Sequence, residues 1–181
     1  SPDMDPIMEI AHEHGLYVIE DNAQCLLNKY KGRQTGTIGH IASYSFENTK
    51  HLSCGEGGII VTDDKDLAEM CRKVGGHGFA NLRAEEGRIK LNSEVFQNPE
   101  YKRHDCLGFM YRLPEVAAAM GLAQLEKLDM FVEKRVEMAT MYKEIIENNG
   151  CDWLTPQYVP NGDINSYYTY AINFRNNDFK W

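Results

Sequence analysis

Hydrophobic residues near the start of the chain change from helical to strand-like spacing. Over Asp5–His14 they recur on one helical face, and Gly15 stands where helices commonly end. The apolar run Leu16–Ile19 then predicts a short buried strand. A helix, a glycine turn and a buried strand form the half-unit of a parallel α/β sheet, which binds ligands at the carboxyl ends of its strands. Glu20 and Asp21 fall at that position.

Two further apolar segments, Ile41–Phe46 and Gly58–Thr62, predict two more strands. Asp64–Val74 has the spacing of an amphipathic helix. Residues 75–105 are charged and weakly periodic, which predicts a long loop. Loops beyond about 12 to 15 residues are uncommon in compact domains and are often functional. We therefore expect this loop to pack on a partner or to cover a site.

A long helical pattern begins at Glu115 and continues to Ile146. A single helix of that length would be far longer than the average of about 10 to 14 residues, so we predict a bend near Gly121 or a break around Asp129. Beyond it, hydrophobic and polar residues alternate over Tyr168–Phe174, which predicts a half-buried strand.

Composition narrows the classes of partner. The 181 residues are 43% hydrophobic and 25% charged, which is typical of a globular protein. A net charge of -8 without a Lys/Arg run argues against nucleic acid and against a polybasic membrane patch. No apolar run approaches the roughly 18 residues that span a bilayer, and the start lacks a signal-peptide pattern. We expect a cytoplasmic protein whose partners are small molecules or other subunits.

The cysteine and histidine spacing predicts neither disulfides nor a metal site. The five cysteines are scattered and never form a C-x-x-C pair, and we expect them to be reduced and structural. His77 and His104 lie in the predicted loop without metal-ligand spacing.

Two side chains offer chemistry at strand ends. Asp21 follows the first predicted strand, although a carboxylate there can simply cap the next turn. Lys50 lies between a strand and the glycine-rich turn Gly55–Gly58, although most lysines are merely solvated. Neither residue is diagnostic alone.

The order of three motifs is more specific. Residues 20–24 read E-D-N-A-Q, residues 45–50 read S-F-E-N-T-K, and residues 55–58 read G-E-G-G before an apolar strand. In this order they resemble the nucleotide-sugar aminotransferases of the DegT/DnrJ/StrS family. The resemblance continues through residues 65–69 and 121–125, so it covers effectively the whole chain.

This resemblance implies an α/β fold and a subunit about twice this length. Residues 1–128 would form the C-terminal portion of the large domain of pyridoxal-phosphate fold type I, the aspartate aminotransferase fold, which is a mainly parallel sheet flanked by helices. Residues 129–181 would form a connecting helix and the beginning of a smaller α+β domain.

The resemblance also assigns four residues to a pyridoxal 5'-phosphate site. Lys50 would form the internal Schiff base, which requires an amine whose pKa is lowered by its surroundings. Asp21 would bind the pyridine nitrogen and keep it protonated, so that the ring accepts electrons. Gln24 would approach the phenolic oxygen, and Ser45 would donate its hydroxyl to the phosphate.

The reaction that the family pattern implies is transfer of an amino group from an amino acid, typically glutamate, to a keto-sugar carried on a nucleotide. It would serve surface-polysaccharide or secondary-metabolite sugar synthesis. A related class of sugar dehydratases uses the same fold but has histidine in place of the motif lysine, and Lys50 argues against it. A non-catalytic protein that retains the fold is the remaining alternative. We expect a homodimer with shared active sites, in which residues 75–112 reach into the neighbouring subunit.

One position departs from the family pattern. The family commonly has Asn in G-[YF]-N-x-R, where it contacts the neighbour's phosphate, but here Met110 occupies that position. Methionine cannot replace the hydrogen bond, so another donor such as Arg112 or the backbone would serve the phosphate, or the region docks differently. His51 either lies near the cofactor or, more commonly for a loop histidine, meets a backbone carbonyl. Tyr167, Tyr168 and Tyr170 are expected to pack a strand rather than to stack on a ligand.

Overall fold

The structure is a computed structural model that describes residues 1–175. The elements in chain order are α1 (Met4–His14), β1 (Ile19–Asp21), β2 (Lys29–Tyr30), β3 (Arg33–Gln34), β4 (Ile41–Ser45), β5 (Gly58–Val61), α2 (Lys65–Gly75), β6 (Leu82–Arg83), β7 (Gly87–Arg88), α3 (Ser93–Gln97), α4 (Glu115–Leu125), α5 (Leu128–Asn148), β8 (Leu154–Pro156) and β9 (Ile172–Phe174). The predicted second domain ends in residues 176–181, which lie outside the described residues.

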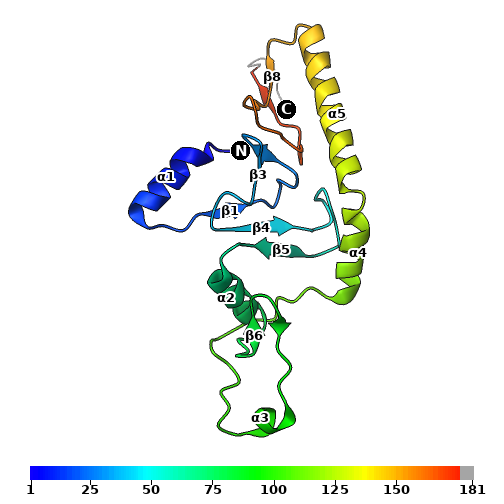
Figure 1. Ribbon diagram of the computed structural model, residues 1–181. Coiled ribbons are helices and arrows are strands. Elements are labelled where there is room, and N and C mark those ends of the chain that lie inside the picture. Colours follow the sequence, from blue (N-terminus) through cyan, green and yellow to red (C-terminus); the bar gives the residue numbers. More distant parts are fainter. Residues whose placement is uncertain (176–181) are drawn as a thin grey trace.

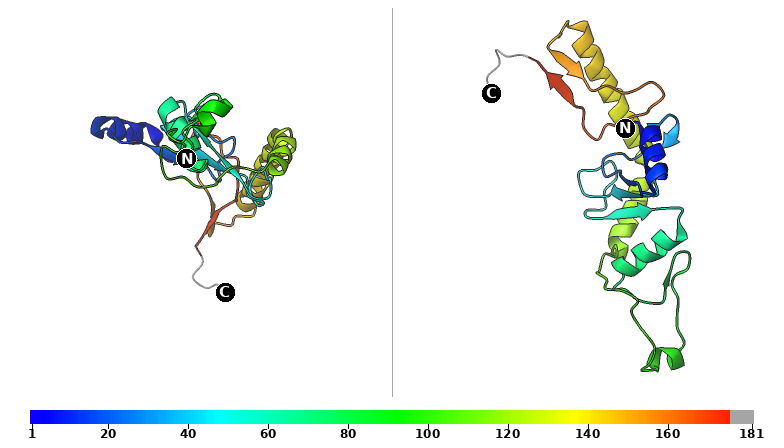
Figure 2. Two further views of the ribbon diagram at one scale, coloured as in Figure 1. Left: turned by 90° about the horizontal axis from the view of Figure 1, so that it is seen from below. Right: turned by 90° about the vertical axis from the view of Figure 1, so that its left-hand side faces the viewer.

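The molecule is elongated around a small central sheet (Figures 1 and 2). Helix α1 lies on one side of this sheet and α4 on the other. Below the sheet in Figure 1, α2 leads into an arm formed by residues 76–112. At the opposite end, α5 rises to a two-stranded ribbon of β8 and β9. The sheet therefore lies between two extensions.

The central sheet has the strand order β1-β4-β5. Strands β1 and β4 are parallel, with Asp21 opposite Ser43. Strand β5 is antiparallel to β4, with Gly58 opposite Ser45. The predicted α/β class is confirmed, and the described sheet is mixed. The connection of residues 46–57 contains no helix, whereas the crossover between parallel strands is usually helical.

Helix α1 agrees with the predicted helix, and Gly15 ends it at φ 62°. The strand that follows is shifted. Only Ile19 of the predicted strand Leu16–Ile19 is in β1. Ile19 is 73% exposed, and Leu16 is 56% exposed. The predicted burial is therefore wrong for the described chain, since β4 is the only strand that β1 contacts in the sheet.

The predicted amphipathic helix is α2, whose first turn is capped by Asp64, which accepts hydrogen bonds from the backbone N–H groups of Asp66 and Leu67. The predicted long loop is more ordered than expected. It contains the β6–β7 hairpin and the short helix α3, and β-bridges join its two sides at Gly76–Met110 and Phe79–His104. Its periodicity is weak because these elements are too short to show one.

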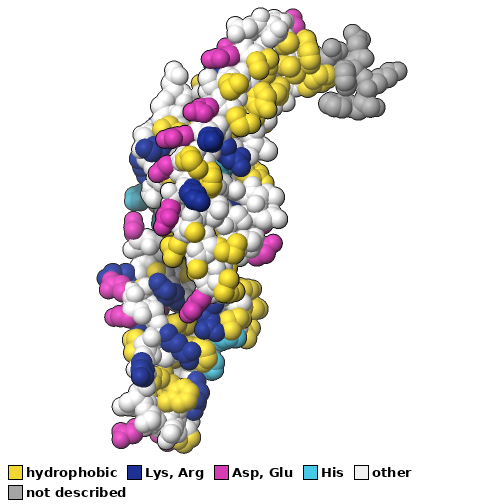
Figure 3. Space-filling model, turned by 90° about the vertical axis from the view of Figure 1, so that its right-hand side faces the viewer, with side chains coloured by type: hydrophobic (Ala, Val, Ile, Leu, Met, Phe, Trp, Pro, Cys, Tyr) yellow, Lys and Arg dark blue, Asp and Glu magenta, His cyan; other side chains and the backbone are white. Residues whose placement is uncertain are grey.

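Helices α4 and α5 account for the long helical pattern. The break falls at residues 126–127, close to Asp129 as predicted, while α4 passes through Gly121 without interruption. Figure 3 shows apolar side chains along this side of the molecule. Those of α4 are exposed: Val116, Met120, Leu122 and Leu125.

Of the predicted strand Tyr168–Phe174, only β9 forms. The backbone before it is irregular, because Tyr167 has a left-handed φ of 51°. The alternation of hydrophobic residues therefore overstated the strand, and the tyrosines at its start are free to make other contacts.

Two small clusters of buried side chains hold the elements together. One consists of Met4, Tyr30 and Ile38. The other consists of Leu52, Leu128 and Val132, and it fixes the start of α5 to the segment between β4 and β5. No helix of residues 1–175 has the length and hydropathy needed to cross a membrane.

Candidate active site

The parallel pairing of β1 and β4 brings Asp21 and Ser45 to one edge and one face of the sheet. Asp21 lies opposite Ser43, and Ser45 lies two residues farther along β4, so these side chains project from the same face. The backbone N–H of Asn22 donates to Ser43 O over 2.9 Å and extends the ladder past the end of β1. A carboxylate and two hydroxyls therefore converge at the carboxyl ends of adjacent strands.

Asp21 is exposed, and its Oδ1 accepts one hydrogen bond, from the backbone N–H of Ala23 at 3.0 Å. The remaining carboxylate oxygen has no hydrogen-bond partner among residues 1–175, so it is available to a ligand. Gln24 follows in the same turn and is also exposed. The turn therefore presents an acidic and an amide side chain close together in sequence.

Lys50 lies in the connection between β4 and β5, and hydrogen bonds close the base of this connection. Phe46 N donates to Gly57 O at 2.8 Å, and Cys54 N donates to Phe46 O at 2.9 Å. Ser45 Oγ accepts from Glu47 N at 3.3 Å, and Lys50 N donates to Glu47 O at 3.1 Å. These bonds hold the backbone of Lys50 near the end of β4.

The two residues after Lys50 anchor it further. His51 and Leu52 are each 3% exposed, whereas the side chain of Lys50 is half-buried. Within the described residues, no carboxylate oxygen lies within 4 Å of Lys50 Nζ, since no ion pair includes it. An amine on a fixed backbone and free of an ion pair is suited to forming a covalent bond with a carbonyl carbon.

A residue that sequence reasoning missed faces this lysine. Lys50 Nζ lies 4.4 Å from the centre of the Tyr168 ring, and the Tyr168 hydroxyl lies 2.9 Å from Thr49 Oγ1. Tyr168 was expected to pack a strand, but it is not part of one. Its position next to Ser166 and the left-handed Tyr167 could not be read from a period-two pattern.

His51 adopts the second of its two predicted roles. Its Nε2 lies 3.1 Å from the backbone oxygen of Ser166. Burial lowers the pKa of His51, the positive charges of Arg135 and Lys50 lower it further, and the hydrogen bond to Ser166 opposes them. A neutral ring that donates from Nε2 leaves Nδ1 as an acceptor, and this buried atom has no partner among the described residues.

Glu20, which the sequence placed with Asp21 at the ligand-binding end of the strand, has a structural role instead. Its side chain is buried on the opposite face from Asp21, and its carboxylate accepts three backbone hydrogen bonds, from Gly36 at 2.7 Å, Ile38 at 2.8 Å and Gly39 at 2.6 Å. It therefore shapes the turn beneath β1. Successive side chains of a strand point to opposite faces, so two adjacent acidic residues at a strand end indicate separate roles.

The arm carries Met110 at the position where the family pattern has Asn. Met110 and Arg112 are exposed, and Arg112 Nε lies 3.2 Å from Met110 Sδ. Neither side chain contacts Lys50 or Asp21 through any hydrogen bond or ion pair within the described chain. All five cysteines are unpaired, and no group of three or more potential metal ligands occurs in residues 1–175.

The donor set fits pyridoxal phosphate. The cofactor needs an amine for its carbonyl carbon, an acid for its pyridine nitrogen and donors for its phosphate. Lys50, Asp21 and Ser45 provide these groups at one edge of the sheet.

Comparison with known proteins agrees with this chemistry. The profile of the DegT/DnrJ/EryC1/StrS aminotransferase family matches residues 1–180. The GDP-perosamine synthase of Escherichia coli O157:H7 is 39% identical over 146 residues, which is 81% of this chain but 35% of that protein. The chain therefore spans about a third of the length of this curated relative.

Solved structures extend the agreement to the fold. A DegT DnrJ EryC1 StrS aminotransferase from Brucella abortus superposes with a TM-score of 0.77 at 29% identity, covering 98% of this chain and 42% of that one. An E. coli GDP-4-keto-6-deoxy-D-mannose-3-dehydratase, solved with bound hydrated pyridoxal phosphate, has the same fold at TM-score 0.80 and 22% identity, covering 97% of this chain and 44% of that one. The chain belongs to the DegT/DnrJ/EryC1/StrS aminotransferase family and forms part of a pyridoxal-phosphate fold of type I.

Proposed function

We propose that the subunit to which this chain belongs is a pyridoxal-phosphate-dependent aminotransferase that converts a keto-sugar, carried on a nucleotide, into an amino-sugar. The observation that supports this most directly is the position of Lys50. It combines a backbone fixed at the end of β4, an amine without an ion pair among the described residues, and the acid Asp21 at the end of the adjacent strand.

In this proposal Lys50 holds the cofactor covalently through Nζ and, once displaced, accepts and returns the proton that leaves the substrate carbon. Asp21 faces the pyridine nitrogen and keeps a proton there. Ser45 donates its hydroxyl to the phosphate, and Gln24 approaches the phenolic oxygen. The bound cofactor supplies an electron sink for the charge that develops on the substrate carbon.

The substrate class rests on the relatives. One is a GDP-perosamine synthase, and another, from Campylobacter jejuni, is a UDP-4-amino-4,6-dideoxy-N-acetyl-beta-L-altrosamine transaminase. We propose a nucleotide-linked keto-sugar as acceptor and glutamate as amino donor, in surface-polysaccharide or secondary-metabolite synthesis in the cytoplasm. Structural neighbours also include sugar dehydratases. A dehydratase of this fold would have histidine at the position of Lys50, so transamination is the better supported reaction.

The proposed large domain comprises residues 1–128 and the proposed small domain begins at residue 129. The break between α4 and α5 supports this boundary. We further propose a homodimer in which the arm of one subunit completes the site of the other. The exposed apolar side chains of α4 and the projection of the arm from the sheet support an interface with a second copy (Figures 1 and 3).

Borohydride trapping tests the function directly. In the complete subunit, reduction after loading with pyridoxal phosphate should add the cofactor mass to the peptide that contains Lys50. Lys50→Ala should abolish both this adduct and transamination, while Lys134→Ala, an exposed lysine on α5, should preserve both. A Lys50→Ala enzyme that transaminates at the wild-type rate would contradict the assignment. A wild-type protein that binds no cofactor would support the non-catalytic alternative.

A further inference from the structure

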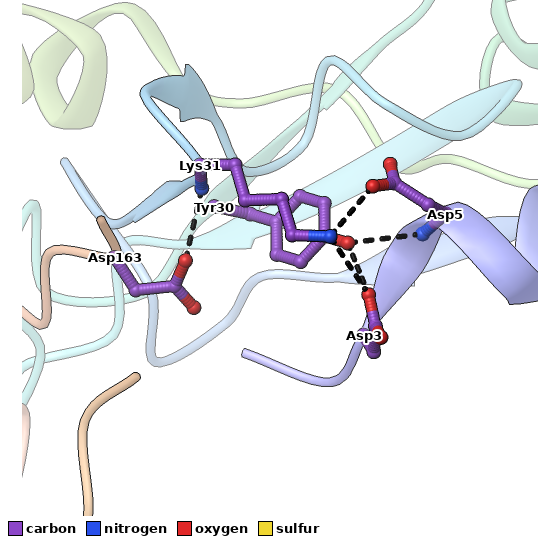
Figure 4. A network of polar contacts seen from close by, with 5 residues as sticks. All are labelled: Asp3, Asp5, Tyr30, Lys31 and Asp163. Carbon is purple, nitrogen blue, oxygen red and sulfur yellow. Dashed lines mark hydrogen bonds and ion pairs between the residues drawn. The ribbon is translucent and has the colours of Figure 1, made fainter. Parts of the chain in front are cut away.

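The segment of residues 163–168, here called the strap, returns from the region of α5 to the β2–β3 hairpin. Its Ile164 exchanges two backbone hydrogen bonds with Lys29, at 2.8 and 3.0 Å. Asp163 Oδ1 accepts from the backbone N–H of Lys31 at 2.9 Å, and the Lys31 side chain binds Asp3 and Asp5 at the start of α1 (Figure 4). The first half of the strap is therefore fixed to the β2–β3 turn and, through it, to α1.

The second half of the strap is fixed even more closely. Ser166 is completely buried, and both its backbone N–H and its hydroxyl donate to Asn28 Oδ1, at 2.7 and 2.6 Å. Its carbonyl faces His51 Nε2. Arg135 on α5 donates from Nη1 to the carbonyl oxygens of Tyr167 and Tyr168, at 3.2 and 3.0 Å. These contacts from three directions determine where the next side chain points.

That side chain is Tyr168. The left-handed backbone of Tyr167 is uncommon for a residue other than glycine, and such strain persists only where surrounding contacts enforce it. It directs the Tyr168 ring to Lys50 Nζ at 4.4 Å, and Thr49 Oγ1 meets the ring's hydroxyl at 2.9 Å. An ammonium within about 6 Å of an aromatic centre is attracted by the ring's quadrupole.

We propose that Tyr168 is a positioning residue for Lys50: its ring receives the lysine ammonium whenever an incoming amine has displaced Lys50 from the cofactor. This inference rests on the proposed function of Lys50. During the exchange, the bond between Nζ and the cofactor carbon breaks and a bond from the incoming nitrogen to that carbon forms. The protons that leave the incoming ammonium arrive on Nζ, and nothing is oxidised or reduced. Lys50 therefore ends as an ammonium beside the ring, and it must release one of these protons to solvent before it can accept the proton that leaves the substrate carbon.

The contact favours only one side of this exchange. The ring attracts the free ammonium of Lys50. When the lysine nitrogen is bonded to the cofactor, it is no longer at the Tyr168 ring. Removing the ring should therefore shift the balance toward the attached lysine, by about 2- to 30-fold for a cation–π contact of ordinary strength. A tyrosine that merely fills space would not change this balance in a way that depends on its ring.

The test uses the complete cofactor-loaded enzyme and methylamine, which can displace Lys50 whatever the natural amino donor is. At each methylamine concentration, borohydride fixes the partition, and peptide mass spectrometry measures the fraction of Lys50 that carries the cofactor. We expect Tyr168→Leu to raise the methylamine concentration for half-displacement by about 2- to 30-fold. Tyr168→Phe keeps the ring and should stay within about 2-fold of wild type.

Tyr170→Leu is the matched control, because this tyrosine lies two residues beyond the strap and its ring contacts Tyr142 and Tyr167. It should leave the midpoint unchanged. If Tyr168→Leu does not fold, Tyr168→Met removes the ring with a different side chain and should give the same shift. The inference is overturned if the folded ring-free variant has the wild-type midpoint. It is also overturned if Tyr168→Phe shifts the midpoint as much as the ring-free variant does. Absence of the Lys50 adduct in wild type would instead refute the proposed function.

Discussion

The carboxylate of Glu20 accepts hydrogen bonds from backbone N–H groups of the turn beneath β1, in place of backbone carbonyl oxygens. Three N–H groups donate to it, and burial removes the water that could substitute. In Glu20→Gln one acceptor oxygen becomes an NH2 group, which cannot accept and which faces a donor. We predict a loss of about 1 to 3 kcal/mol in the free energy of unfolding, because a buried donor is left without a partner. Urea denaturation of the complete subunit measures it.

Glu56→Gln provides the comparison for this change. Glu56 is exposed, so the same substitution should alter stability by less than about 0.5 kcal/mol. Equal stabilities for the two variants would mean that the three short contacts to Glu20 contribute little.

His51 makes the free energy of unfolding depend on pH. Its pKa is lowered in the folded chain, chiefly by burial and then by the cations Arg135 and Lys50. Above its ordinary value of about 6.5 the residue is neutral in both the folded and unfolded states, so its contribution to stability is constant. As the pH falls below that value, the unfolded chain binds the proton first, and the free energy of unfolding decreases.

We therefore predict that wild-type protein loses more stability between pH 7.5 and pH 5.5 than His51→Gln does. The amide of the variant can donate to Ser166 but does not titrate. Urea denaturation at each pH gives the two slopes. His14→Gln serves as a control at an exposed histidine on α1. Parallel pH profiles for wild type and His51→Gln would show that the strap is insensitive to this proton.

Among the short turns, the one at Gly36 combines a special backbone with close packing. Gly36 has φ 89°, and a Cβ there would overlap the Tyr44 hydroxyl, which donates to Thr35 O at 2.6 Å. Gly32 has φ 81° with no atom within 4 Å of its Cβ position. Both alanine variants incur the left-handed cost of about 1 to 2 kcal/mol.

We expect Gly36→Ala to lose more stability than Gly32→Ala by at least about 1 kcal/mol, because only Gly36→Ala also has a clash to relieve. Thermal unfolding of the two variants compares them directly. Similar melting temperatures would mean that Tyr44 moves aside freely.

Elements with a long repeating pattern were predictable from the sequence, and short ones were not. Helices α1 and α2 and the break between α4 and α5 follow from helical spacing over several turns. The two-residue strands β6 and β7 lie inside a segment interpreted as a loop, because two residues cannot display a period. Strand β9 is shorter than predicted since contacts made by the strap override the alternation before it.

Some residues of the candidate site were likewise predictable from the sequence, and others were not. Lys50, Asp21 and Ser45 occur in local motifs, so their types and spacing could be recognised. Tyr168 approaches Lys50 through contacts with Asn28, His51 and Arg135, which are distant in sequence. No local pattern encodes such a contact, because it depends on how α5 and the strap fold back onto the sheet.

At the scale of the whole molecule, the proposed shared site predicts complementation. A Lys50→Ala subunit has an intact arm, and a subunit lacking residues 81–102 has an intact Lys50. If each alone is inactive, random exchange in an equal mixture makes about half of the dimers hybrid, each with one complete site. We therefore expect about one quarter of wild-type activity.

Sedimentation of the complete subunit at micromolar concentration accompanies this measurement and should show a dimer. An active monomer, or hybrid dimers without activity, would exclude a site completed by the partner's arm.

The strap is synthesised long after Asn28 and Thr49, two of the residues that it contacts. Tyr168 is 119 residues beyond its hydrogen-bond partner Thr49, and Ser166 is 138 residues beyond Asn28. Ribosomes add about 5 to 20 residues each second, so roughly 6 to 24 s separate the synthesis of Thr49 from that of Tyr168. During this interval Lys50 has been synthesised and its aromatic neighbour has not. A reactive aldehyde in the cell could therefore meet this lysine before the tyrosine has been made.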